Sequence, residues 1–354
     1  MNEIAEILTW SRPSDTPAKW RTRYEDLLES RVLSKAGLID QDHCILDSLS
    51  LLPRERQGSF LRSPHVASRL LEGDQGEGFD AAPIAKALLA ELAAVGIVSE
   101  LPEPVWTVNG DRKLDPVIRE SWAASNFGIL DSHIVVDGSG PTDFSCEATG
   151  NLTLASEIER VTVERKIHEA ASAISATSDV AFKFWTDCVD VVAIRKASLS
   201  STRFSSSSFS RNAELTVLTN AHLDSVDLTL MADALVHESI HSLLFTYEEI
   251  EQAFVSTDEN AERIKLKSPW SGNQLFLPAY VHACVVWYGL YWFWSLGLKT
   301  GIYEEEQAKK MRDRARLGFH SSPVSICLRP HQEQLSISIH SLLSDIEYIM
   351  RCAP

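Results

Sequence analysis

The sequence has few of the residues that hold together small secreted domains or thiolate metal sites. Its 354 residues include six cysteines, and none of them stands in a C-x-x-C pair. Scattered cysteines argue against a disulfide framework and against a zinc site built from thiolates. The first residues, Met1 to Glu6, are acidic and lack the basic-then-apolar pattern of a signal peptide. We therefore expect a cytoplasmic protein with reduced thiols.

Basic residues are also in the minority. The chain has 33 Lys and Arg against 49 Asp and Glu, which gives a formal net charge of -16. An excess of negative charge makes nucleic acid or an anionic membrane surface a poor partner. The hydrophobic and charged fractions, 44% and 23%, are those of an ordinary globular protein. A peptide or amino-acid substrate fits better; the oligomeric state is left open, with a homodimer as one option.

One stretch lacks charge altogether. No charged side chain occurs from Ser268 to Leu298, and Ala279 to Leu298 is mostly apolar and aromatic. A membrane-spanning helix needs about 20 such residues. However, this stretch contains Pro278 and His282, and its Trp and Tyr residues are spread along its length instead of gathering at its ends. We expect a buried helix in a large core and no membrane span.

The rest of the chain predicts an α+β protein that is mostly helical and has a small β-sheet. Residues 1–100 form a helical N-terminal region, and residues 101–354 form an α+β region with the metal site and the catalytic residues. Apolar residues at three-to-four spacing indicate helices, and short β-prone runs between Gly and Pro residues indicate strands. The expected helices are Trp20–Lys35, Ala81–Val98 and Leu154–Ile174, and the expected strands are Val105–Val108, His133–Val136, Val189–Ile194 and Glu214–Thr219.

The strongest chemical signal is the motif His237-Glu238-Ser239-Ile240-His241 inside an apolar, helix-favouring run. Residues four apart on a helix lie on one face, one turn from each other. His237 and His241 can therefore direct two imidazoles at one point, as a metal ion requires. Asp224 or Ser225 is expected to cap this helix, and the strand Glu214–Thr219 precedes it, which is the usual layout of zinc peptidases.

Two kinds of residue could supply a third ligand. Glu259 and Glu262 lie 18 and 21 positions after His241, which is the spacing at which thermolysin-like peptidases place a ligating glutamate. His282 lies about one turn after Pro278, at the start of the uncharged helix. A buried imidazole needs a hydrogen-bond or metal partner, because burial of a polar ring without one is costly. A metal ion could be that partner for His282.

This arrangement resembles the HExxH-motif peptide-modification proteins, which are associated with ribosomally synthesised and post-translationally modified peptides. The residues that carry the resemblance are His237 to Ser242, Pro269-Trp270, Tyr280 to Ala283 and Phe293-Trp294. The resemblance implies an iron(II)- and 2-oxoglutarate-dependent peptide hydroxylase outside the jelly-roll fold. It also implies a metal site between the two buried helices, with His237, His241 and His282 as ligands.

The chain departs from the family pattern just after Pro-Trp. Family members often carry arginines there, whereas this chain continues with Ser271 and Gly272. An arginine is the natural partner for the distal carboxylate of 2-oxoglutarate. Replacements could come from Arg263, Lys265, Lys267 or Arg329. We take the co-substrate site to involve Ser268, Trp270, Ser271 and Arg329.

The role of Glu238 depends on the metal. With iron(II), Glu238 would orient a ligand, the substrate or a water, and the product would be a hydroxylated side chain of a peptide or amino acid. With zinc and a glutamate as third ligand, Glu238 would be the general base of a metallopeptidase. A third hypothesis is a non-catalytic scaffold with a degenerate site. We favour the oxygenase because of the resemblance.

Overall fold

A computed structural model describes most of the chain outside residues 102–151. The described residues are 2–36, 44–71, 81–99, 101, 105–108, 112–114, 121–123, 134–137, 152–197, 203–210, 212–251, 253–256, 258, 261 and 263–353. They form two compact units, each assembled from separate segments. The helical unit comprises Met1–Pro17, Lys166–Cys188 and Ser225–Pro354, and the sheet unit comprises Ala18–Arg165 and Val189–Asp224.

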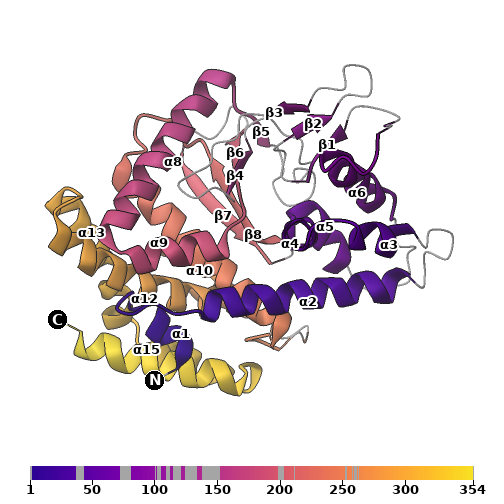
Figure 1. Ribbon diagram of the computed structural model, residues 1–354. Coiled ribbons are helices and arrows are strands. Elements are labelled where there is room, and N and C mark those ends of the chain that lie inside the picture. Colours follow the sequence, from indigo (N-terminus) through magenta and orange to yellow (C-terminus); the bar gives the residue numbers. More distant parts are fainter. Residues whose placement is uncertain are drawn as a thin grey trace. The chain divides into compact units, whose positions relative to one another are not determined.

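The predicted fold class is confirmed. The chain is a mostly helical α+β protein with small open sheets, and the described strands close no barrel (Figure 1). The division into residues 1–100 and 101–354 stays a prediction. The expected helices and strands occur within a few residues of their predicted limits. A further strand, β7 (Ser205–Phe209), lies in a serine-rich part of the chain.

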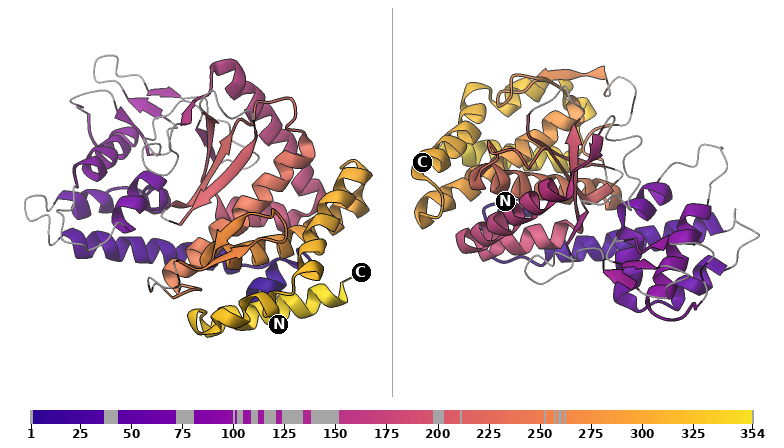
Figure 2. Two further views of the ribbon diagram at one scale, coloured as in Figure 1. Left: turned by 180° about the vertical axis from the view of Figure 1, so that it is seen from behind. Right: turned by 90° about the horizontal axis from the view of Figure 1, so that it is seen from above.

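The sheet unit contains a mixed sheet with the order β4-β6-β8-β7, and β5 also pairs with β6. Its strands, visible as neighbouring arrows in Figure 2, are β4 (Val135–Asp137), β5 (Leu152–Leu154), β6 (Val191–Ala197), β7 and β8 (Asn212–Thr219). The central pairs β4–β6 and β6–β8 are parallel, whereas β7 is antiparallel to β8. Every residue of β8 is buried, as expected for a strand inside a sheet that is covered on both faces.

The remaining elements of the sheet unit are helices and a smaller antiparallel sheet with the order β1-β2-β3. Their bounds are α2 (Thr16–Ala36, whose first two residues belong to the helical unit), α3 (Cys44–Ser50), α4 (Arg54–Arg62), α5 (Pro64–Leu71), α6 (Ala82–Ala94), β1 (Val105–Trp106), β2 (Arg112–Leu114) and β3 (Ser121–Ala123).

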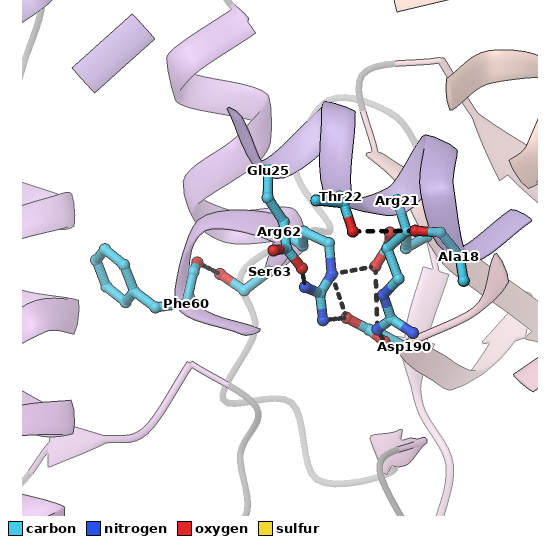
Figure 3. Close-up of polar contacts among 9 residues, drawn as sticks. Ala18, Arg21, Thr22, Glu25, Phe60, Arg62, Ser63 and Asp190 are labelled. Carbon is cyan, nitrogen blue, oxygen red and sulfur yellow. Dashed lines mark hydrogen bonds and ion pairs between the residues drawn. The ribbon is translucent and has the colours of Figure 1, made fainter. Parts of the chain in front are cut away.

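A cluster of charged side chains is buried beside the first residues of β6 and β8 (Figure 3). The Arg62 guanidinium donates to Asp190 at 3.0 and 3.1 Å and to Glu214 at 2.9 Å, and it also pairs with Glu25. Arg21 of α2 pairs with Asp190 from the other side. Burial and the negative charge of Asp190 raise the pKa of Glu214 to about 8, against the opposing effect of the two arginines. The cluster joins α2 and α4 to the sheet.

The helical unit is built around α10 (Leu228–Ile250) and α12 (Leu277–Thr300), which pack against each other. The other elements are α1 (Glu3–Ile7), α9 (Asp179–Cys188), β9 (Lys265–Lys267), β10 (Gln274–Phe276), α13 (Glu305–Ser321), α14 (Val324–Leu328), the 3-10 helix η1 (Arg329–Gln334) and α15 (Ile337–Cys352). Helix α8 (Glu157–Thr177) contributes residues to both units.

The uncharged stretch forms a buried helix, as predicted. α12 is apolar around most of its circumference, carries Pro278 in its first turn and ends at Gly301 in the left-handed conformation. Gly289 allows close packing, because a Cβ there would lie 2.6 Å from the Ile240 side chain of α10. None of the helices among the described residues, α12 included, has the length and apolar character that a membrane span requires.

Two predicted helix starts are wrong by a few residues. The cap of α10 is Asp227, not Asp224 or Ser225, because the Asp227 carboxylate accepts the N–H of Leu230 at 2.8 Å. α8 starts at Glu157 instead of Leu154, which belongs to β5. Ser156 and Glu159 exchange hydrogen bonds ahead of it as a capping box.

Candidate functional site

α10 presents His237 and His241 on one face, as the motif predicts. The helix is fixed by its Asp227 cap and by a long buried apolar face. The two imidazole centroids are 5.0 Å apart and the ring planes are inclined by 48°. The His237 side chain is 27% exposed, and His241 is half-buried.

α12 brings His282 to His241. The two rings are stacked, with centroids 5.4 Å apart and planes inclined by 21°. Their Nδ1 atoms face each other at 3.2 Å. His282 is 3% exposed and is surrounded by Phe245 and Phe254, whose ring centroids lie 4.7 and 5.8 Å from its own. His241 and His282, which were both predicted as ligands, are therefore in contact.

Glu248 completes this arrangement, and sequence reasoning did not select it. Its Oε2 lies 2.8 Å from Nε2 of His282, and its Oε1 accepts the backbone N–H of Phe254 at 2.9 Å. With the Nε2 proton directed at Glu248, the lone pair of His282 is on Nδ1 and faces His241. The available signal was spacing: Glu248 follows His241 by seven positions, two helical turns along the same face.

The electrostatics of the cluster keep His241 neutral. Removal from water, with smaller effects of His237 and His282, holds the pKa of His241 well below its ordinary value. Asp233, one turn before His237 in the same helix, is half-buried and accepts the indole N–H of Trp294 at 2.7 Å. Burial raises the pKa of Asp233. A neutral imidazole is the form that binds a metal.

One pair of the predicted ligands has a separation compatible with a shared metal ion. Metal–nitrogen bonds measure about 2.0–2.1 Å, so two ligating nitrogens on one ion lie about 3 Å apart; the Nδ1 atoms of His241 and His282 are 3.2 Å apart. A ligating histidine commonly donates its other N–H to a carboxylate, as His282 is placed to do toward Glu248. The His241–His282 pair is hydrogen-bonded in the structure, and its separation alone is compatible with two ligands of one metal ion.

The third ligand is not in position. Within the described residues, no group of three or more His, Cys, Asp and Glu side chains is placed so that it could hold a metal ion. His237 lies next to His241 on the helix but would have to turn its ring to join the pair. The alternative ligands Glu259 and Glu262 lie outside the described residues.

Glu238 is almost fully buried, with 3% of its side chain exposed, and its Oε1 lies 4.0 Å from Nε2 of His237. A general base for hydrolysis must reach a water beside the substrate.

The strand before α10 also differs in role from the strand that pairs with substrate in zinc peptidases. β8 is hydrogen-bonded to β6 on one side and to β7 on the other, so it offers no free edge to a peptide.

Of the four residues predicted to bind the co-substrate, Trp270 is linked to the histidines through one aromatic ring. Its ring stacks on Trp287 of α12 at 5.8 Å, and Trp287 meets the ring of His237 edge-on at 6.3 Å. Ser268 is buried, and its Oγ accepts the N–H of Ser271. Ser271 and Arg329 are exposed and form no hydrogen bond or ion pair with the described residues of the cluster.

A basic residue outside the predicted set lies beside this aromatic wall. The guanidinium carbon of Arg314, from α13, is 4.7 Å from the centroid of a Trp287 ring. Of the candidates named from the sequence, Lys265 lies over Phe276 instead.

Neither a family model nor a curated protein matches the chain.

Proposed function

We propose that the helical unit is an iron(II)- and 2-oxoglutarate-dependent oxygenase that hydroxylates a side chain of a peptide or amino acid. His241 and His282 hold the metal, with His237 as third ligand. The observation that carries the proposal is the 3.2 Å separation of the two Nδ1 atoms, together with the hydrogen bond between the far nitrogen of His282 and Glu248.

The metal, when bound, supplies open coordination positions for a 2-oxo acid and dioxygen. The chain supplies the rest. Glu248 holds the Nε2 proton of His282 and so leaves Nδ1 free to ligate. His241 stays neutral and needs only to move its proton from Nδ1 to Nε2. Phe245 and Phe254 exclude water from one side of His282.

Two observations favour this function over a zinc peptidase. Glu238 is buried, and β8 has no free edge with which to pair a substrate strand. Glu238 serves as support beside His237 in this proposal.

The four described cysteines, Cys188, Cys284, Cys327 and Cys352, are free thiols. Free thiols are typical of a reducing compartment, and a cytoplasmic location is part of the proposal.

The test is the substitution His282→Ala, with metal content and 2-oxoglutarate consumption as readouts. We expect the variant to lose metal and co-substrate turnover together, because one of the two paired nitrogens is gone. His320→Ala is the matched control, since His320 is exposed and its Nδ1 lies 3.2 Å from the carbonyl oxygen of Arg316. Full metal binding in His282→Ala would contradict the proposed ligand set.

A further inference from the structure

A small cavity lies between the start of the chain and α9, inside the helical unit. It is half enclosed, has a volume of about 150 Å³, and has a wall made almost entirely of carbon atoms. The apolar residues of this wall are Ile7, Pro13, Pro17, Val180 and Phe184. An engineered apolar cavity of about 150 Å³ in another protein stays dry and binds benzene, because water needs polar partners that such a wall does not offer. The cavity therefore suits a single apolar ring.

Trp10 holds in place the part of the chain that forms one side of the cavity. Its indole N–H donates to the carbonyl of Gly289 at 2.8 Å, and its ring meets the ring of Phe184 edge-on at 5.0 Å. The φ angle of Trp10 is 56°, in the left-handed region that residues other than glycine rarely occupy. Such a conformation persists only where the surrounding contacts enforce it. The chain therefore leaves Trp10 in a fixed direction, toward α9.

The segment from Pro13 to Pro17 is stiff for two reasons. The Ser14 hydroxyl donates to Oγ1 of Thr16 at 2.9 Å and accepts the Thr16 backbone N–H at 3.1 Å, and the Thr16 hydroxyl donates to the Glu3 carboxylate of α1 at 2.5 Å. The two prolines fix their own φ angles. A wall that is formed before a ligand arrives reduces the entropy lost on binding.

The mouth of the cavity carries an excess of negative charge. Asp179 and Lys183, one turn apart on α9, both border the cavity and are both exposed. The Lys183 ammonium is already paired with the Asp187 carboxylate at 2.5 Å. Asp179 accepts the Ser175 hydroxyl at 3.3 Å and forms no ion pair with another described residue. The charge left over at the mouth is that of Asp179, which attracts a cation.

We infer that this cavity binds a small aromatic amine, with the ring against the apolar wall and the ammonium at the mouth beside Asp179. The inference goes beyond the proposed function and requires no metal. The ring provides most of the affinity, because its burial removes carbon from water. The ion pair is exposed to solvent and adds only about two- to five-fold.

The experiment compares two probes that have the same ring and linker but opposite charges. 2-Phenylethylamine and 3-phenylpropionate are each titrated against the purified chain, and the NMR signals of the probe report binding. We expect a dissociation constant of about 1 mM for the amine, as burial of a six-carbon ring in a half-enclosed cavity provides. The acid should bind about two- to five-fold more weakly.

Four variants make the result specific. Val180→Trp fills the cavity with a larger side chain and should weaken both probes by at least about ten-fold. Val161→Trp is its matched control, because Val161 is exposed on α8 and does not line the cavity. Asp179→Asn should keep the ring bound and make the two affinities equal, whereas Asp313→Asn, on α13, removes the same charge outside the lining and should keep the preference. Thermal unfolding of each variant verifies the fold.

No saturable binding of the amine to the unmodified chain would overturn the inference, and so would undiminished binding by Val180→Trp. Equal affinities of the unmodified chain for the two probes would also overturn it, because the ligand would then not be selected as an amine. The titrations use no metal and no 2-oxo acid, so either result leaves the proposed function to its own test.

Discussion

Substitution of Arg62 by Met tests the buried charge cluster of the sheet unit. Arg62 is the last residue of α4, its side chain is 7% exposed, and it contacts three carboxylates. Methionine keeps most of the aliphatic length and removes the charge. Asp190 then retains Arg21 as a partner, and Glu214 keeps only a longer ion pair with Arg21 at 3.6 Å, whereas Glu25 loses its partner in the cluster.

The magnitude follows from burial. Removal of one member of a buried ion pair costs about 3–5 kcal/mol, because the remaining charge stays in a poorly solvated position. Because the pKa of Glu214 is about 8, this carboxyl is mostly protonated at neutral pH, so the lower end of that range applies. A loss of about 3 kcal/mol is a large share of the 5–15 kcal/mol that stabilises a typical domain.

The assay is hydrogen exchange of the backbone amides of β6 and β8, which reports the free energy of unfolding of the sheet unit separately from the helical unit. Arg54→Met is the matched control, because Arg54 begins the same helix, its side chain is 73% exposed, and its nearest carboxylate oxygen, on Glu29, is 4.0 Å away. We expect the control to change stability by less than about 0.5 kcal/mol. Equal protection in the two variants would refute the reasoning.

Two other predictions concern single carboxylates. The folded-state pKa of Glu214, about 8, lies above its ordinary value, so the folded chain binds more protons than the unfolded chain between pH 4.5 and 8 and loses stability as pH rises through that window. Glu214→Gln, which is neutral at every pH, should remove most of this slope in urea unfolding curves, and an unchanged slope would exclude Glu214 as its origin. Glu248→Gln can accept only one of the two hydrogen bonds that the carboxylate accepts from His282 and Phe254; metal titration should show a 10- to 100-fold weaker affinity, as for other carboxylate partners of ligating histidines. Unchanged metal affinity would mean that Glu248 does not orient His282.

Local sequence signals predicted α10 and α12 because each is long and has a clear apolar pattern. The motif spacing placed His237 and His241 on one face, and the uncharged run identified a buried helix with His282 near its start. The start of α10 was misplaced because Asp224, Ser225 and Asp227 are all good caps, and only the backbone geometry selects Asp227.

The positions of Arg314 and Arg62 could not be predicted, because they depend on contacts between segments that are distant in the sequence. Arg314 follows His237 by 77 positions, and its place over Trp287 depends on how α13 packs against Trp270. Arg62 meets Asp190, 128 positions away, for the same reason. Periodicity identifies the buried face of a helix but not the helix that covers it.

We propose that His241 and His282 hold an iron that works with 2-oxoglutarate. The most direct measurement is the metal content of anaerobically purified protein together with its consumption of 2-oxoglutarate. We expect about one bound metal ion per chain, held by the His241–His282 pair, and 2-oxoglutarate turnover that depends on iron(II). Stoichiometric zinc with no consumption of 2-oxoglutarate would contradict it.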